Sequence, residues 1–323
     1  QGMNIGRSAT LLAGLPKTVP GYSIDRWCAG ALTATTTVAG AIAMGAIDIA
    51  IAGGVEHMGN HPMGELMDPN PRYLAEKLVE QDALAMGATA ERLHDRYPSI
   101  TKERADLYAY NSQMKTAKAY EEGLIQRDLI PTAARSEELG WTIISADEGP
   151  RPTTTMEGLA GLKTPFRPGG RVTAGNASGI NDGAAFFVLA DAETAKKAGH
   201  KPIARLVSYA VAGVPNHIMG EGPIPATKLA LERAGLKLDQ MDVIESNEAF
   251  AAQALAVTKG LGLDPAKTNV NGGAIALGHP IGCSGAAIAT KAIHELQRVQ
   301  GKYALVTMCI GGGQGIATIF ERL

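Results

Sequence analysis

Cysteine is scarce in this sequence, with three residues in 323, at positions 28, 283 and 309. An odd number of widely spaced cysteines excludes a fully paired disulfide framework, which favours a reducing compartment. Aromatic residues make up only 5 % of the chain, whereas glycine occurs 39 times. This combination predicts tight turns and closely packed helices.

A strong charge of one sign is also lacking, because 30 basic and 32 acidic residues leave a net charge of −2. Such a chain has no general attraction to nucleic acid or to an anionic membrane, so an anionic ligand must be bound by local groups. No apolar run is long enough to predict a membrane span, and no secretory signal opens the sequence.

These absences favour a cytoplasmic protein. An organellar location stays open, because the opening stretch QGMNIGRSAT has no initiator methionine. We expect that the true N-terminus lies before this start.

Short apolar runs alternate with helical segments, which indicates α/β layers built as two domains or one large unit. Strands are expected over residues 48–54, 184–191, 241–247, 303–313 and 316–323. Helices are expected over residues 29–45, 225–235, 248–260 and 285–298.

One order of elements occurs twice. The stretch YSID leads to a Cys/Gly turn, a helix of small residues over 29–45, and the strand DIAIAGG. The stretch KTNV leads to a Gly/His turn, a helix over 285–298, and the strand YALVTMCIGGG. Two similar halves packed face to face would place their turns side by side. Chance alternation of helices and strands could also produce this repeated order.

The stretch from about 63 to 171 differs from the rest. It holds charged helical segments around 88–95 and 102–122 and a run rich in proline, threonine and glycine, DEGPRPTTTMEGLAGLKTPFRPGG. We interpret it as a polar insertion, which in such folds is often a lid or a binding element.

Four motifs contain residues with suitable chemistry. Cys28 lies where a strand ends and a helix begins, a position that favours the thiolate, although a small buried hydrophobe is the plainer interpretation. Cys309 closes a strand before IGGG, where bare amides could face a ligand oxygen. His279 lies in the glycine-rich turn GGAIALGHPIGCSG. Asn247 and Glu248 are expected at a helix cap and in its first turn, and capping alone would explain both.

Together, CAGA, NEAFA, GGAIALGHPIGCSG and CIGGG, in this order and near these separations, resemble the motifs of the thiolase family. The resemblance spans essentially the whole chain and includes GGVEHM, TAGNASGINDGAA and MGEGPIPA. Within the family, GGVEHMGNHPMG and GGGQGIATIFERL are most similar to bacterial fatty-acid β-oxidation thiolases, which partner a hydratase/dehydrogenase chain.

The resemblance implies a fold of two similar α/β halves, packed as α-β-α-β-α layers with a loop domain inserted. The N-terminal half would comprise residues 1–62 and 172–198, the CoA-binding loop domain 63–171, and the C-terminal half 199–323. The family normally has roughly sixty further residues before this start. Two departures lie at the cysteine turn: Gly30 stands where serine is common, and Asp25 where asparagine is common.

The resemblance implies catalytic roles for the residues at the matching motif positions of this chain. Cys28 is the expected nucleophile, His279 the base that takes its proton and an oxyanion donor, and Asn247 the residue that positions a water in the first oxyanion hole. Cys309 would carry the second proton, and the amides of Cys28 and Gly311 would form the second hole. The resemblance gives Cys283 no role, and the remaining histidines show no metal-ligand spacing.

Coenzyme A is expected on the insertion as a co-substrate, with no tightly bound cofactor and no metal. By resemblance, Arg151 reaches the nucleotide, Phe166 packs near the adenine or pantetheine, Ala174 and Ser178 contact the pantetheine arm, and Met86 lines the pocket near the thioester. On charge alone, Arg167 and Arg171 are equally suited to bind the phosphates.

The implied reaction is thiolysis of 3-ketoacyl-CoA by CoA, giving acetyl-CoA and a shorter acyl-CoA in fatty-acid β-oxidation. A biosynthetic acetoacetyl-CoA thiolase is the nearest alternative, and a non-catalytic thiolase-like CoA or lipid carrier is a more distant one. A ketoacyl synthase would need a second histidine in place of NEAF. A nicotinamide-dependent oxidoreductase would need an early G-x-G-x-x-G, which is lacking. We expect a homodimer or a dimer of dimers.

Overall fold

Two sheets and the helices between them form the body of the protein. The computed structural model describes residues 3–65, 68–136 and 140–323; residues 1–2 of the opening segment, and 66–67 and 137–139 of the expected insertion, lie outside the described residues. The first sheet pairs β1 (Ile49–His57) with β4 (Asp182–Ala190) in antiparallel register. The second sheet has the order β5-β8-β7-β6.

Three of the four strands of the second sheet are almost completely buried, and β5 at its edge is partly exposed. Its strands are β5 (Ala204–Gly213), β6 (Val243–Ser246), β7 (Tyr303–Ile310) and β8 (Gln314–Arg322). Strand β7 pairs antiparallel with β8 and parallel with β6. Buried on both faces, β7 is a continuous apolar run rather than an alternating one, as expected for a strand with helices on both sides.

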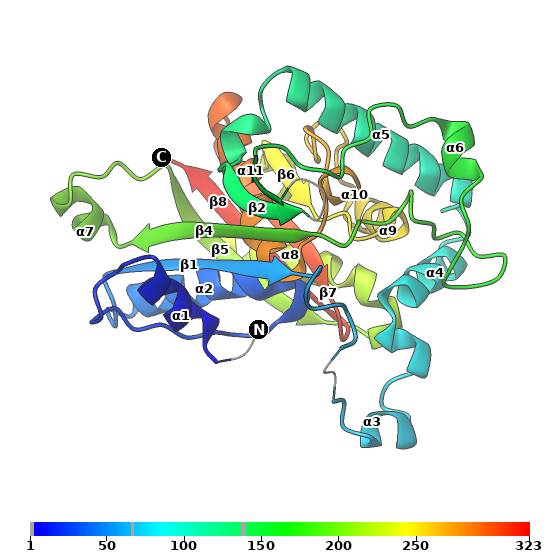
Figure 1. Ribbon diagram of the computed structural model, residues 1–323, viewed down its shortest axis with the longest axis horizontal. Helices are drawn as coiled ribbons and strands as arrows, with labels where there is room; N and C mark the ends of the chain where they lie inside the picture. Colours follow the sequence, from blue (N-terminus) through cyan, green and yellow to red (C-terminus); the bar gives the residue numbers. More distant parts are fainter. Residues whose placement is uncertain (1–2, 66–67, 137–139) are drawn as a thin grey trace.

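Helices α2 (Gly30–Ala43) and α11 (Ile281–Arg298) lie between the two sheets (Figure 1). Helix α11 packs against α2 and contacts strands of both sheets. Helices α8 (Pro223–Ala234) and α9 (Ala251–Leu261) lie on the other side of the second sheet, where α8 packs directly on its strands and on α9. The order across the molecule is therefore sheet, helices, sheet, helices.

The outward face of the β1–β4 pair is open among the described residues. Side chains on this face are apolar and exposed: Ile51 is 55 % exposed, Phe186 54 % and Val188 70 %. They share one face because Ile51 stands opposite Val188 and the side-chain period of a strand is two. The inner face of the same pair contacts α2 and α11.

The region between β1 and β4 carries helices and a separate hairpin outside both sheets. Its helices are α3 (Arg72–Ala75), α4 (Met86–Arg96), α5 (Lys102–Glu121) and α6 (Met156–Ala160). Among the described residues, strands β2 (Thr132–Ser136) and β3 (Gly140–Ile144) pair only with each other. Helix α3 stands away from the body at the bottom of Figure 1. The remaining helices are α1 (Ile5–Leu12), α7 (Ala192–Lys197) and α10 (Ala274–Leu277).

The strands and helices expected by residue range are present, with ends shifted by a few residues, whereas β5, α1 and the β2–β3 hairpin were not predicted. No strand precedes Cys28 among the described residues, so the expectation that a strand ends at this cysteine is wrong. In both parts of the chain a helix leads into a strand that pairs antiparallel with a later strand: α2, β1 and β4, then α11, β7 and β8. The domain boundaries given above stay a prediction.

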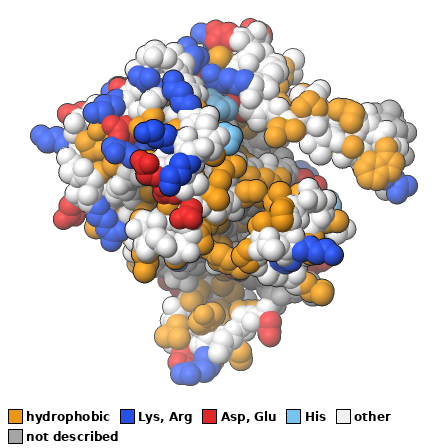
Figure 2. Space-filling view, turned by 90° about the vertical axis from the view of Figure 1, so that its left-hand side faces the viewer, with side chains coloured by type: hydrophobic (Ala, Val, Ile, Leu, Met, Phe, Trp, Pro, Cys, Tyr) orange, Lys and Arg blue, Asp and Glu red, His pale blue; other side chains and the backbone are white. Residues whose placement is uncertain are grey.

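On the side of the molecule drawn in Figure 2, basic and acidic side chains are interspersed, and neither sign of charge forms a continuous patch. This mixture agrees with the near-neutral net charge of −2. Within the described ranges, no helix combines the length and the apolar character needed to cross a bilayer.

Candidate active site

Cys28 lies in a single 3₁₀ turn, Trp27–Ala29, that leads directly into α2. The preceding residue, Trp27, has a φ of 46°, a conformation rare for a bulky side chain. The Asp25 Oδ1 accepts a hydrogen bond of 2.9 Å from the Trp27 amide and holds this turn. Since an aspartate oxygen accepts as an asparagine oxygen does, the departure at Asp25 leaves the turn intact.

Two backbone amides approach the Cys28 thiol, its own and that of Gly311, which follows β7. Burial nevertheless raises the pKa of Cys28 to about 11, although both amides lower it; the charge of Glu56 raises it further. The resting group is therefore a neutral thiol, which needs a base before it can attack.

His279 lies in the turn between α10 and α11 and is 6 % exposed. Its backbone amide donates to Asn181 Oδ1 at 3.0 Å. Its ring Nδ1 lies 2.6 Å from Ser284 Oγ, whose hydroxyl donates to the Pro280 carbonyl at 2.8 Å. Because that hydroxyl hydrogen is used, Nδ1 carries the imidazole proton and Nε2 is left unprotonated.

The unprotonated Nε2 is the atom that a general base requires. The amide Nδ2 of Asn247 lies 3.4 Å from it, a contact that suits a donor facing a lone pair. Burial lowers the pKa of His279 to about 4, which keeps the ring neutral at physiological pH. The Oδ1 of Asn247 is buried and has no partner among the described residues.

The predicted capping roles of Asn247 and Glu248 are wrong. Helix α9 begins only at Ala251, and its N-cap is Phe250. The two polar residues follow β6 directly, and both are 2 % exposed. Their side chains point into the protein rather than along the helix axis, since each contacts groups distant in the sequence.

Glu248 connects the glycine-rich turn to α5. Its carboxylate accepts from the hydroxyls of Tyr108 at 3.2 Å and Ser112 at 2.6 Å. It also accepts from Asn269 Nδ2 at 2.9 Å and the Ile275 amide at 3.3 Å. A Cβ on Gly273 would lie 2.3 Å from this carboxyl carbon, so the glycine is required for this approach. Four donors fix the segment that leads to His279.

Cys309, at the end of β7, is completely buried and packs with Met219 and Ala249. Burial raises the pKa of Cys309 well above its ordinary range, and the negative charge of the Cys28 thiolate adds to the effect. The 3₁₀ turn that contains Cys28 packs on β7, the strand that contains Cys309. Met86 and Phe250 pack against the same cluster, and the predicted place of Met86 in the CoA pocket stays a prediction.

Cys283 lies in the first turn of α11, 3 % exposed, where burial raises its pKa to about 12. Glu56, which sequence reasoning missed, accepts the Gly282 amide at 3.0 Å and joins β1 to this turn. Ser284 was missed as well, although its position five residues after His279 in the same turn was a usable signal. The contact of Asn181 with the His279 amide had no such local signal.

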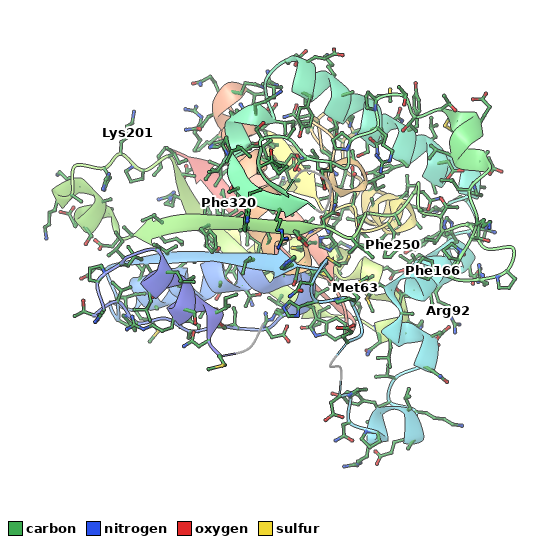
Figure 3. All side chains as sticks on the ribbon, in the orientation of Figure 1. Met63, Arg92, Phe166, Lys201, Phe250 and Phe320 are labelled. Carbon is green, nitrogen blue, oxygen red and sulfur yellow. The ribbon has the colours of Figure 1, made fainter. Side chains whose placement is uncertain are left out.

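Phe166, one of the predicted CoA contacts, lies beside α4 (Figure 3). The Phe166 ring packs on Gly87, next to Met86 at the start of α4. The Ser178 amide donates to the Ala249 carbonyl at 3.0 Å, which places the loop containing Ala174 and Ser178 against the Cys309 cluster.

The three arginines proposed for phosphate binding differ in their partners. Arg167 is paired with Asp95 at 2.6 Å and Glu91 at 3.1 Å. The guanidinium of Arg171 donates to two backbone carbonyls, those of His94 and Ile100. In the described part of the chain, the guanidinium of Arg151 has neither an ion pair nor a hydrogen bond, while its backbone amide is fixed by Gln113 at 2.7 Å. Arg151 is thus the arginine most available to a phosphate.

Comparison with known proteins gives consistent results. Residues 1–193 match the thiolase N-terminal domain and residues 200–322 the thiolase C-terminal domain. The chain is 48 % identical to the 3-oxoadipyl-CoA/3-oxo-5,6-dehydrosuberyl-CoA thiolase of Escherichia coli, over 99 % of this chain and 84 % of that protein. It is 45 % identical to a 3-ketoacyl-CoA thiolase of Aliivibrio fischeri, over 100 % of this chain and 84 % of the relative.

Solved structures agree with the sequence relatives. The acetyl-CoA acetyltransferase of Bacillus anthracis superposes with a TM-score of 0.89 at 42 % identity, over 99 % of this chain and 83 % of that one. Human mitochondrial 3-ketoacyl-CoA thiolase gives a TM-score of 0.90 at 40 % identity, over 98 % and 83 % of the two chains.

Proposed function

This chain belongs to the thiolase family and has the thiolase fold, and from that premise we propose that it cleaves 3-ketoacyl-CoA with CoA through an acyl-enzyme on Cys28. Its activity is that of an acyltransferase of the thiolase type. The observation that carries the proposal is the geometry of the buried base His279, whose Nδ1 lies 2.6 Å from Ser284 Oγ and whose unprotonated Nε2 faces Asn247 Nδ2 at 3.4 Å.

In the first half-reaction, Nε2 of His279 takes the proton from Cys28, and the thiolate attacks the C3 carbonyl carbon. The C2–C3 bond then breaks, and its electron pair stays on C2 as the enolate of acetyl-CoA. The Cys309 thiol gives its proton to C2 and releases acetyl-CoA. His279 and a water held by Asn247 would stabilise the enolate oxygen of the departing acetyl-CoA, which was its thioester carbonyl oxygen, and this supplies a role for the unpartnered Oδ1 of Asn247. The C3 oxygen becomes the oxygen of the thioester on Cys28.

In the second half-reaction, the Cys309 thiolate takes the proton of the CoA thiol, and the CoA sulfur attacks the acyl carbon on Cys28. The tetrahedral intermediate collapses, the shortened acyl-CoA leaves, and protonated His279 returns its proton to Cys28. The amides of Cys28 and Gly311 would stabilise the thioester oxygen, and each such donor is worth about 3 kcal/mol. CoA enters as a co-substrate along Arg151, Phe166, Ala174, Ser178 and Met86.

The substrate class is proposed from the motifs and the relatives. Medium- or long-chain 3-ketoacyl-CoA, as in β-oxidation, is the first candidate, since relatives named 3-ketoacyl-CoA thiolase are 44–45 % identical. A second candidate is a substrate with a terminal carboxylate, because the relative named for 3-oxoadipyl-CoA is 48 % identical. The structural neighbour named acetyl-CoA acetyltransferase keeps acetoacetyl-CoA as the third substrate to test.

Thiolysis assays separate these substrates. We expect kcat/KM for straight-chain 3-ketoacyl-CoA of six or more carbons to exceed that for acetoacetyl-CoA and 3-oxoadipyl-CoA by at least about tenfold. A preference of that size for 3-oxoadipyl-CoA would replace the β-oxidation role by the second candidate. No cleavage of any 3-ketoacyl-CoA would contradict the proposed function itself.

Assembly and location belong to the same proposal. We expect a homodimer or a dimer of dimers, and association with a hydratase/dehydrogenase chain in the cytoplasm of a bacterium. The exposed apolar face of the β1–β4 pair and the small-residue helix α2 support self-association. Light scattering at micromolar concentration tests the first part, and an active monomer would contradict it. Recovery of the chain from its native host without such a partner would contradict the second.

A further inference from the structure

Trp27 directly precedes the nucleophile Cys28 in the sequence. Its side chain is 41 % exposed, so one side of the indole is open and the other is packed. The packed side lies on Gly311. A Cβ built on Gly311 would stand 1.8 Å from Cε3 and 2.2 Å from Cζ3 of the indole.

The indole determines how closely the two turns of the site approach. The three heavy atoms nearest to that Cβ position all belong to Trp27. The two residues after Gly311 are Gly312 and Gly313, with φ of 76° and 82°, so the turn itself contains little to stiffen its backbone. The ring therefore supplies the contact against which the Gly311 peptide rests.

The backbone at Trp27 adds a second, independent observation. A φ of 46° costs a non-glycine residue on the order of 1 kcal/mol or more. Glycine would adopt this conformation without strain, yet the chain has the bulkiest side chain at this position. This strained backbone conformation, held by the hydrogen bond to Asp25, orients the indole toward Gly311.

We propose that Trp27 is a positioning residue, whose indole holds the Gly311 amide against Cys28 so that both backbone donors keep their direction as the thioester oxygen gains charge. The inference rests on the proposed function, because the second oxyanion hole has meaning only in a thiolase. It assigns the geometry of that hole to a side chain that itself touches no reacting atom.

Three variants test the contact. Trp27→Gly keeps the backbone conformation and deletes the ring, and we expect kcat to fall at least tenfold while KM changes less than about threefold. Trp27→Phe retains an aromatic ring and should stay within about threefold of the wild type. Should Trp27→Gly fail to fold, Trp27→Leu takes its place with the same expectation, since its side chain is not a flat ring.

A double-mutant cycle distinguishes this role from general packing. Gly311→Ala in the wild type forces a methyl group into the indole, whereas in Trp27→Gly the methyl has room. The fold decrease in kcat caused by Gly311→Ala should be at least tenfold smaller in the Trp27→Gly background than in the wild type. Equal losses in the two backgrounds, or a Trp27→Gly enzyme with wild-type kcat, would overturn the proposal.

Fluorescence supplies a readout that a purely structural role would not change. The chain has two tryptophans, and Trp141 lies 74 % exposed on the β2–β3 hairpin. In Trp141→Phe, which should retain full activity, all tryptophan emission comes from Trp27. We expect this emission to change when Cys28 is acylated, and unchanged emission in an acylated enzyme would contradict the inference. A wild type without thiolysis would contradict the proposed function and this inference together, whereas an active wild type with unaffected variants contradicts the inference alone.

Discussion

At the scale of single residues, the protonation of His279 is fixed by one hydroxyl group. Ser284 Oγ accepts from Nδ1 and donates to the Pro280 carbonyl, so the catalytic nitrogen Nε2 carries the lone pair. This arrangement needs no carboxylate partner, which agrees with burial being the one resolved cause of the lowered pKa of His279. The base stays neutral, and its orientation depends on Ser284.

Ser284→Ala should therefore lower kcat by roughly 10²-fold with little change in KM, because the neutral ring can then place its proton on Nε2. The matched control is Thr290→Ala. Thr290 makes the same hydroxyl bond to a carbonyl four residues earlier on α11, at 3.0 Å, without touching His279. Steady-state kinetics of both variants checks this; a similar loss in the two would show that the helix, rather than the tautomer, was disturbed.

Burial of His279 also makes folding depend on pH. The pKa of His279 is about 4 in the folded protein against an ordinary value of 6.5, so between these values the unfolded chain binds a proton that the folded one does not. Its contribution to stability is present above pH 6.5 and is lost as pH falls towards 4, on the order of 3 kcal/mol in all.

Urea unfolding at pH 7 and pH 5 measures this effect. His279→Asn should lose less free energy of unfolding over this interval than the wild type. His200→Asn, at an exposed histidine, serves as the control and should follow the wild type. A wild type and His279→Asn with the same pH dependence would disprove the assignment.

What the sequence could predict at this scale differs between residues. Cys28 and His279 lie in turns and Cys309 lies at the end of β7 just before a glycine turn, and the neighbouring glycines made these places predictable. Asn247 and Glu248 were misplaced because the capping rules were applied to a helix expected to begin at residue 248, whereas α9 begins at Ala251. Helix α9 begins three residues later, and Glu248 instead faces Ser112, whose position depends on how the chain folds over long range.

At the scale of secondary structure elements, the site depends on how closely α11 approaches α2. A Cβ on Gly285 of α11 would lie 2.7 Å from the Leu32 amide nitrogen and 2.9 Å from Leu32 Cγ. Gly40 of α2 has nothing within 4 Å of the same position. The two glycines share helical backbone but differ in their surroundings, so they form a matched pair.

Both substitutions by alanine gain the same helix propensity, and only one creates a clash. Gly40→Ala should stabilise the protein by about 0.5–1 kcal/mol. Gly285→Ala should destabilise it by about 1–3 kcal/mol and lower kcat, because it pushes the His279-bearing end of α11 away from Cys28. Thermal or urea unfolding measures both. A stabilising Gly285→Ala would contradict the close helix packing described here.

The strands illustrate which elements a sequence reveals. A strand such as β7 is recognisable because it is buried on both faces, so its residues form a continuous apolar run rather than an apolar/polar alternation. Strand β5, at the edge of its sheet, mixes exposed and buried residues and gave no clear run. The β2–β3 hairpin pairs only with itself and carries exposed apolar residues, so its pattern does not indicate a core.

At the scale of the whole molecule, the repeated order of helix and strands explains the location of the site. The turn before α2 contains Cys28 and the turn before α11 contains His279, and these helices pack together between the sheets. The repeated order predicted that the two turns lie side by side. It did not predict which residues of the two helices contact each other, because these helices are separated by well over two hundred residues. Small residues such as Gly285 permit the close approach of the two helices.

The central claim is that Cys28 becomes acylated. The most direct measurement is mass spectrometry of the peptide containing WCAGA after incubation with a 3-ketoacyl-CoA in the absence of free CoA. We predict the mass of the acyl group on Cys28, its retention in Cys283→Ser, and its loss when CoA is added. An acyl group on Cys283 or Cys309 with Cys28 unmodified, or substrate turnover with no adduct on Cys28, would contradict the account.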